Sequence, residues 1–98
     1  MKSSQYRPAN LIIQTILEGI LRAERENSLI KGIVKSHLIN YCGLKSTTAE
    51  KYLIKLENAG YIESHEEPWG DRTIIIYKIT PLGKERYEWF VKINSEIE

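Results

Sequence analysis

The chain has 98 residues and a formal net charge of +1, from fourteen lysines and arginines against thirteen aspartates and glutamates. This length suits one domain, and 42% hydrophobic with 28% charged residues is ordinary for a folded chain, which argues against intrinsic disorder. The small net charge excludes a uniformly basic coat protein but not a local basic surface. A single cysteine, Cys42, excludes an intramolecular disulfide.

The apolar runs of the sequence are all far shorter than the ~20 residues that span a bilayer. Residues 1–7 are polar, and no apolar signal-peptide segment follows them. We therefore expect a cytoplasmic protein without a membrane partner. Fifteen isoleucines, with many lysines and glutamates and few glutamines, favour a thermophilic source.

The first predicted element is a helix that begins at Pro8, where the missing N–H of proline is tolerated, and fades over residues 22–27. Its apolar residues recur at spacings of three and four, at Leu11, Ile12, Ile16, Ile20 and Ala23. Gly19 is expected to mark a close approach of another element. Residues 1–7 are predicted to be a flexible tail, and residues 8–98 a single domain. For residues 29–34 the sequence allows two interpretations, a short edge strand or an extended linker.

Two short helices are predicted next, over about residues 35–59. The first presents Leu38, Ile39 and Cys42 inward, and Gly43 stops it in the left-handed conformation that glycine adopts readily. In the second, Thr47 and Glu50 have the spacing of a capping box, and Gly60 is the stop signal. The turn between them contains glycine and has the length of a helix-turn-helix.

A β-hairpin is predicted over residues 61–79, with strands at 61–65 and 73–79 and a rather long turn around residues 68–72. Thr80 and Pro81 then provide an N-cap and a first helical residue for a final helix at 81–97. The fold class is α+β and mostly helical. A hairpin that directly follows the second helix of a helix-turn-helix makes this a winged helix, with extra N- and C-terminal helices suited to dimerisation.

Residues 43–62 resemble the recognition-helix stretch of winged-helix transcription regulators. MarR, PadR and ArsR-type proteins have a similar run that ends in Leu-Glu-x-x-Gly-Leu/Tyr-Ile, matched here from Leu56 to Ile62. Residues 77–84 are similar to the segment after their wing. The stretch from Lys35 most resembles small archaeal winged-helix proteins, including Sulfolobus DNA-binding proteins that dimerise through a C-terminal coiled coil. The resemblance covers about residues 30–86 and implies a dimeric, DNA-binding regulator.

Charge is unevenly distributed along the chain. Residues 1–60 have nine lysines and arginines against five glutamates, a net charge of +4, whereas residues 61–98 have five against eight acidic residues, a net charge of −3. Within residues 31–55, Glu50 is the one acidic residue against the lysines at 31, 35, 45, 51 and 55. This positive cluster coincides with the helix-turn-helix, where a surface facing phosphates is needed.

The predicted partner is double-stranded DNA, because the second helix of such a motif lies in the major groove with its N-terminal residues nearest the bases. The predicted contacts include three hydroxyls that reach bases or phosphates, those of Ser46, Thr47 and Thr48. Lys51 and Lys55 are predicted on the outward face of that helix, and Lys35 and Lys45 are predicted to hold the DNA backbone. Arg72 is the predicted contact from the wing. One of the three hydroxyls is expected to cap the helix instead. The absence of arginine or glutamine on the helix suggests modest sequence specificity or recognition of DNA shape.

The wing remains ambiguous from sequence. Arg72 suits a phosphate or the minor groove, but Glu66, Glu67 and Asp71 surround it and repel phosphate. Trp69 is expected to fold back onto the hairpin or contact a partner. An alternative interpretation of the tail at residues 1–7 is an arm that contacts DNA through Lys2 and Arg7.

A homodimer is expected because the first and last helices have more apolar residues than one small core needs. The predicted interface residues are Ile13, Leu17, Trp89, Phe90, Ile93 and Ile97.

The sequence thus predicts a cytoplasmic, nucleoid-associated transcription regulator, a repressor rather than an activator, that binds DNA by sequence or shape. Alternatives are a winged-helix protein-interaction module without DNA binding, and an architectural chromatin protein. An enzyme is not expected, because His37, His65 and Cys42 form no catalytic or metal-binding spacing and no phosphate loop appears. No cofactor and no metal site are predicted.

Overall fold

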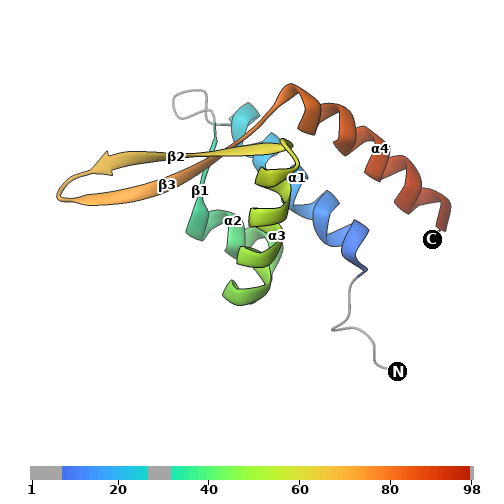
Figure 1. Cartoon of the computed structure of the whole chain (residues 1–98), viewed down its shortest axis with the longest axis horizontal. Helices are drawn as coiled ribbons and strands as arrows, with labels where there is room; N and C mark the ends of the chain where they lie inside the picture. The colour runs from blue at the N-terminus through green and yellow to red at the C-terminus, as the bar shows by residue number, and fades with distance from the viewer. Residues whose placement is uncertain (1–7, 27–31, 98) are drawn as a thin grey trace.

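The structure, a computed structural model, describes residues 8–26 and 32–97. Within these ranges the chain is α+β and mostly helical, and its elements follow the predicted order (Figure 1). The elements are α1 (Ala9–Glu26), β1 (Ile33–Val34), α2 (Lys35–Cys42), α3 (Ser46–Asn58), β2 (Ile62–Trp69), β3 (Arg72–Ile79) and α4 (Pro81–Ile97). The predicted tail at residues 1–7, part of the predicted strand at 29–34, and Lys31 lie outside the described residues.

The apolar face of α1 forms the centre of the core. Ile16, Leu17 and Ile20 are almost completely buried, and α1 packs against α2, β3 and α4. Leu53 of α3 and Ile62 of β2 are buried in the same cluster. Gly19 does mark a close approach, because a Cβ there would lie 2.8 Å from Cδ2 of Tyr41 on α2.

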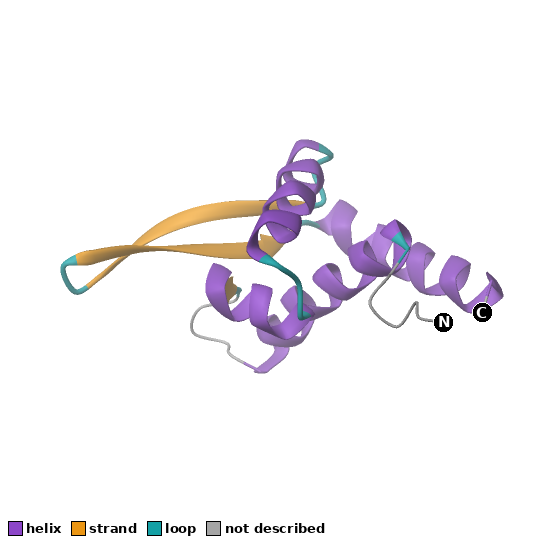
Figure 2. Cartoon of the chain, turned by 90° about the horizontal axis from the view of Figure 1, so that it is seen from below, coloured by secondary structure: helices purple, strands orange, loops and turns teal. Residues whose placement is uncertain are grey.

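The three described strands form an antiparallel sheet in the order β1-β3-β2. Ile33 pairs with Tyr77 and Val34 with Ile76, so residues 33–34 are a strand rather than a linker. The long β2–β3 hairpin leaves the body of the molecule and extends beyond the helices in both views (Figures 1 and 2). This projection explains why most of β2 is exposed.

The hairpin turn is shorter than predicted. Trp69 pairs with Arg72, which leaves Gly70 and Asp71 as the turn, and Gly70 has the positive φ of +67° that a tight turn requires. Pro68 does not end β2, because β2 is an edge strand and a proline there interrupts no inner ladder.

The ends of the helices follow the predicted signals except at the start of α3. Gly43 ends α2 with φ +66°, and Gly60 at φ +83° ends α3 with hydrogen bonds from Gly60 N to Glu57 O and from Tyr61 N to Leu56 O. Thr80 caps α4 by accepting a hydrogen bond from Gly83 N at 3.0 Å. The predicted capping box is wrong, because α3 begins after Lys45 and has no side-chain cap.

Candidate nucleic-acid interface

The N-terminal end of α3 presents polar side chains to solvent. Lys45, Ser46 and Thr47 are exposed, and Thr48 is half-buried against the body. Because Ala49, Leu53 and Leu56 form the buried face, the helix is fixed with this polar face outward. Since no side chain caps α3, the expectation that one hydroxyl caps it is wrong.

Two lysines continue this face toward the hairpin. Lys51 and Lys55 are exposed and lie one helical turn apart. The ammonium of Lys55 lies 5.7 Å from the centroid of the Tyr52 ring, a cation–π contact that holds its aliphatic part along α3. The two positive charges are therefore presented from the same outward surface.

Both carboxylates of α3 are engaged by neighbouring elements. Glu50 pairs with Lys35 of α2, and Glu57 accepts a hydrogen bond of 2.7 Å from Ser64 Oγ of β2. These contacts direct the two carboxylates toward α2 and β2, and the Lys35 ammonium compensates the charge of Glu50. The outward face of α3 consequently keeps Lys45, Lys51 and Lys55 with little opposing charge.

Lys35 has a partner within the protein. Its side chain is 26% exposed and its ammonium pairs with Glu50, and its contact with a phosphate backbone stays a prediction. The hydrogen bond to Glu50 is the main cause that raises the pKa of Lys35 above its ordinary value of 10.5. This ion pair links α2 to α3.

Ile54 belongs to this surface and was not predicted. It is 57% exposed and follows Thr47 and Lys51 at spacings of seven and three residues, which places the three on one outward stripe. The sequence did contain a signal for it, because Ile54 is apolar but lies outside the spacing of the buried residues of α3. The stripe therefore contains one hydroxyl, one ammonium and one apolar side chain. We call Thr47, Lys51 and Ile54 the α3 stripe.

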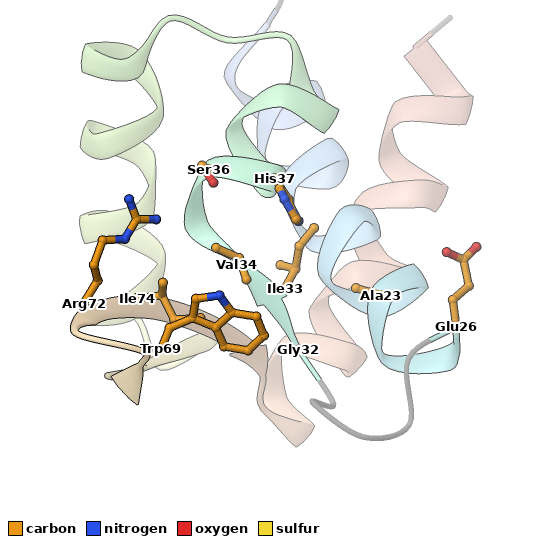
Figure 3. Close-up of a pocket in the computed structure, with 10 residues that line it drawn as sticks. All are labelled: Ala23, Glu26, Gly32, Ile33, Val34, Ser36, His37, Trp69, Arg72 and Ile74. Carbon is orange, nitrogen blue, oxygen red and sulfur yellow. The ribbon is translucent and has the colours of Figure 1, made fainter. Parts of the chain in front are cut away.

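The β2–β3 hairpin, predicted to be a wing, presents a mixed surface. Arg72 and Trp69 are directly opposite in the β2–β3 register, so their side chains lie on the same face of the hairpin. Trp69 is 61% exposed and faces β1 beside Ile74, so it neither packs fully onto the hairpin nor projects freely (Figure 3). The carboxylates on β2 are exposed, and that of Glu63 contacts His65 Nε2 at 2.8 Å. The acidic character predicted for the wing is thus present at its surface.

Two of the predicted interface residues lie in the core. Leu17 is 0% and Phe90 7% exposed, because α1 and α4 pack against each other and both side chains belong to the hydrophobic core. The side of α4 next to this buried face is open: Trp89 is 56% and Ile97 71% exposed, at spacings that also place the half-buried Ile93 on one stripe. These three residues are defined here as the α4 stripe.

The α1–α4 contact also contains a polar group. Asn94 is buried, and its amide donates hydrogen bonds of 2.6 Å to Gln14 Oε1 and 3.3 Å to Asn10 O. Ile13 is half-buried on α1. Directional bonds of this kind fix one alignment of α4 on α1, and they leave the α4 stripe outward.

The described residues were also searched for metal-binding clusters and membrane-spanning helices. No group of three or more His, Cys, Asp or Glu side chains in residues 8–26 and 32–97 is arranged to hold a metal ion. No helix in that part of the chain is long and apolar enough to cross a membrane. Cys42 is buried in the core, and His37 and His65 lie on different elements.

Comparison of the chain with protein-family models, with curated proteins and with solved structures found no match. The interpretation of its surfaces therefore depends on its own residues and their arrangement.

Proposed function

We propose that this chain is a winged-helix protein that binds double-stranded DNA as a transcription regulator, with α3 in the major groove. The observation that supports it best is the outward face of α3, where Lys45, Lys51 and Lys55 surround exposed hydroxyls while both carboxylates of the helix are turned to neighbours. A helix with this distribution suits a groove between two phosphate backbones.

The α3 stripe determines what the helix reads. The Thr47 hydroxyl and methyl group suit base edges near the helix N-terminus, and Ile54 offers an apolar contact to a thymine methyl. Lys51 reaches a phosphate or a guanine edge. None of these three side chains forms the bidentate contact that discriminates most strongly between bases, so DNA shape contributes much of the selectivity.

The wing contributes one cation at most. Arg72 lies next to the turn of the projecting hairpin, where a wing meets the flanking minor groove or a phosphate. The exposed carboxylates of β2 oppose closer contact along the rest of the strand. Binding is consequently centred on α3.

A homodimer completes the proposed regulator. A few phosphate contacts from one protomer bind weakly at cellular salt, and pairing two protomers doubles them. The α4 stripe provides an exposed apolar surface for a second copy. A dimer on a palindromic site near a promoter represses by occupancy alone and needs no activating surface. We therefore favour repression.

The test is a fluorescence-anisotropy titration of DNA at several salt concentrations, with the double variant Lys51→Ala/Lys55→Ala. Each lysine that neutralises a phosphate contributes about 0.9 to the salt slope, so the slope falls by about 2 per protomer. The matched control is Lys84→Ala/Lys92→Ala, which removes the same charge from exposed positions of α4 outside the α4 stripe. Equal binding by both double variants contradicts the proposal.

A second candidate function is a protein-interaction module without DNA binding. The exposed carboxylates Glu63, Glu66 and Glu67 of β2, next to the exposed Trp69, favour it, because an acidic strand with a large aromatic residue suits a basic peptide. Selection of bound sequences from a random DNA pool separates the two functions. Enrichment of a palindrome with half-sites about 34 Å apart supports the regulator, and no enrichment supports the module.

A further inference from the structure

The outer edge of β2 is a free edge of the sheet. The strand order β1-β3-β2 places β2 on one side of β3, and among the described residues no other strand pairs with it. The hairpin that contains β2 projects beyond the helices (Figures 1 and 2), and the residues of β2 are exposed except Ile62 and His65. A free strand edge offers unpaired backbone N–H and C=O groups to another extended chain.

The register of the hairpin decides which backbone groups of β2 point to this edge. Trp69 and Arg72 close a two-residue turn and therefore exchange both backbone hydrogen bonds, and bonded pairs recur at every second position of β2. The N–H and C=O groups of Ser64 and Glu66, and the C=O group of Pro68, consequently face outward. Proline has no N–H group, which agrees with an outward position at Pro68. An added strand can thus form backbone hydrogen bonds along positions 64–68.

Side chains at alternate positions of β2 lie on one face of the hairpin. On the face that presents the indole, the side chains of β2 are Glu63, His65, Glu67 and Trp69. Glu63 is opposite Lys78 of β3, whereas Glu67 is opposite Ile74 and has no ion pair within residues 8–26 and 32–97. This face therefore presents two carboxylates four positions apart, followed by an exposed indole.

The charge of the strand selects its partner. Glu66 lies on the other face, opposite Ile75, and Glu57 of α3 adds a carboxylate near the base of the strand through its hydrogen bond with Ser64. Two copies of β2 paired edge to edge would bring these carboxylates together, and like charges opposite each other in a strand pair are destabilising. The edge is consequently unfavourable for a second copy and favourable for a cationic chain.

We propose that the free edge of β2 binds an extended segment of another protein that has lysine or arginine at alternate positions. The segment adds a fourth strand to the sheet through backbone hydrogen bonds with Ser64 and Glu66. Its cations lie on the indole face, where two of them pair with Glu63 and Glu67 and another contacts the ring of Trp69. Backbone bonds supply affinity, and the alternation of cations supplies selectivity.

The contact uses β2, whereas the proposed DNA contact uses the outward face of α3. Strand addition gives a binding site and a binding mode to the basic partner of the second candidate function, on which it rests for the class of partner. It does not require DNA binding, and its tests contain no DNA. DNA binding and strand addition can therefore fail independently.

The probe is a capped seven-residue peptide in which lysine and threonine alternate, with lysine at both ends. Amide signals and amide hydrogen exchange are followed by NMR while the peptide is titrated to saturation. We expect the N–H groups of Ser64 and Glu66 to exchange about tenfold more slowly in the complex, because they gain acceptors. The N–H groups of His65 and Glu67 already bond to β3, so their exchange should change by less than about twofold.

Two control peptides separate strand addition from simple attraction of charge. One has the same residues with its lysines in a single block, and the other has N-methyl groups on the threonine amides that would donate to β2. Both keep the charge of the probe. Each should bind about tenfold more weakly, because several backbone hydrogen bonds or their matching charge pairs are lost.

Two protein variants test the face of the hairpin. Glu63→Gln/Glu67→Gln should weaken peptide binding about tenfold, because two cross-strand charge pairs are lost. The matched control Glu66→Gln/Glu88→Gln removes the same charge from the other face of the hairpin and from an exposed position of α4. It should change the affinity by less than about twofold.

Each other result overturns strand addition. Equal weakening by both double variants, or equal binding of all three peptides, would leave only a basic partner of the second candidate function held by charge. Absence of a saturable shift with every peptide would remove that partner as well. Slow exchange of Ser64 and Glu66 that appears without peptide and increases with protein concentration would assign the edge to a second copy.

Discussion

Thr80 joins the start of α4 to the end of α3, and its hydroxyl is the group to remove. The Oγ1 atom accepts from Gly83 N at 3.0 Å and lies 2.6 Å from Gly60 O and 3.0 Å from Tyr61 O, to one of which it donates its single proton. Thr80→Val keeps the shape and β-branching of the side chain and removes these bonds. Thr80→Ser keeps the hydroxyl and is the matched control.

The expected loss can be worked out bond by bond. Loss of an N-cap hydrogen bond costs about 1 kcal/mol. Loss of the bond to Gly60 O costs about 0.5–1 kcal/mol, at the lower end of the range because water can reach that exposed residue. Thr80→Val should therefore lose about 1.5–2 kcal/mol in the free energy of unfolding, or roughly 10 °C in Tm for a domain of this size.

Urea and thermal unfolding, followed by far-UV circular dichroism at one fixed protein concentration, measure this loss. A fixed concentration matters because dimerisation adds to apparent stability. Thr80→Ser should remain within about 0.5 kcal/mol of the wild type. If valine and serine variants unfold at the same urea concentration, the hydroxyl does not fasten α4 to the end of α3, and the reasoning is refuted.

Three further predictions follow from particular contacts. Glu50→Gln releases Lys35 and removes a negative charge beside the α3 face, so DNA affinity should rise about twofold to fivefold in anisotropy titrations, as expected for one surface charge. The same variant should lower the Lys35 pKa toward its ordinary value of 10.5, which an NMR titration measures. Because the Lys35 pKa is raised in the folded chain, the ion pair stabilises the fold fully below pH 10.5. This contribution is lost as the pH rises through the folded-state pKa. Trp89→Lys should convert a dimer at tens of micromolar into a monomer in sedimentation experiments, and a wild type that is already monomeric would exclude the α4 interface. Gly83→Ala should cost about 3 kcal/mol or more in urea unfolding, because its Cβ would overlap the Tyr61 carbonyl, whereas Gly19→Ala should cost less because Tyr41 and Leu38 side-chain atoms can move; equal costs would contradict this.

The elements with strong local signals could be predicted closely. Glycine at positions 43 and 60 ends a helix by adopting a conformation that other residues resist, and Thr80 with Pro81 starts α4 through its own hydroxyl and fixed φ. The hairpin turn was predicted too long, because the tolerance of Pro68 depends on β2 being an edge strand. Strand order is set by pairing across the chain, and no local pattern records it.

Of the candidate site, the sequence by itself determined which residues lie on the outward face of α3, because the spacing of Ala49, Leu53 and Leu56 fixes the buried face and with it the exposed positions of Lys51 and Lys55. Only the tertiary structure decided how the charges are shared. Lys35 and Glu50, fifteen positions apart, meet because the short turn at residues 43–45 brings α3 back beside the start of α2, and Leu17 and Phe90 face inward because α1 and α4 pack on each other. The period of a helix follows from local backbone geometry, whereas the partner of a charge or of an apolar face depends on which elements the whole chain brings together.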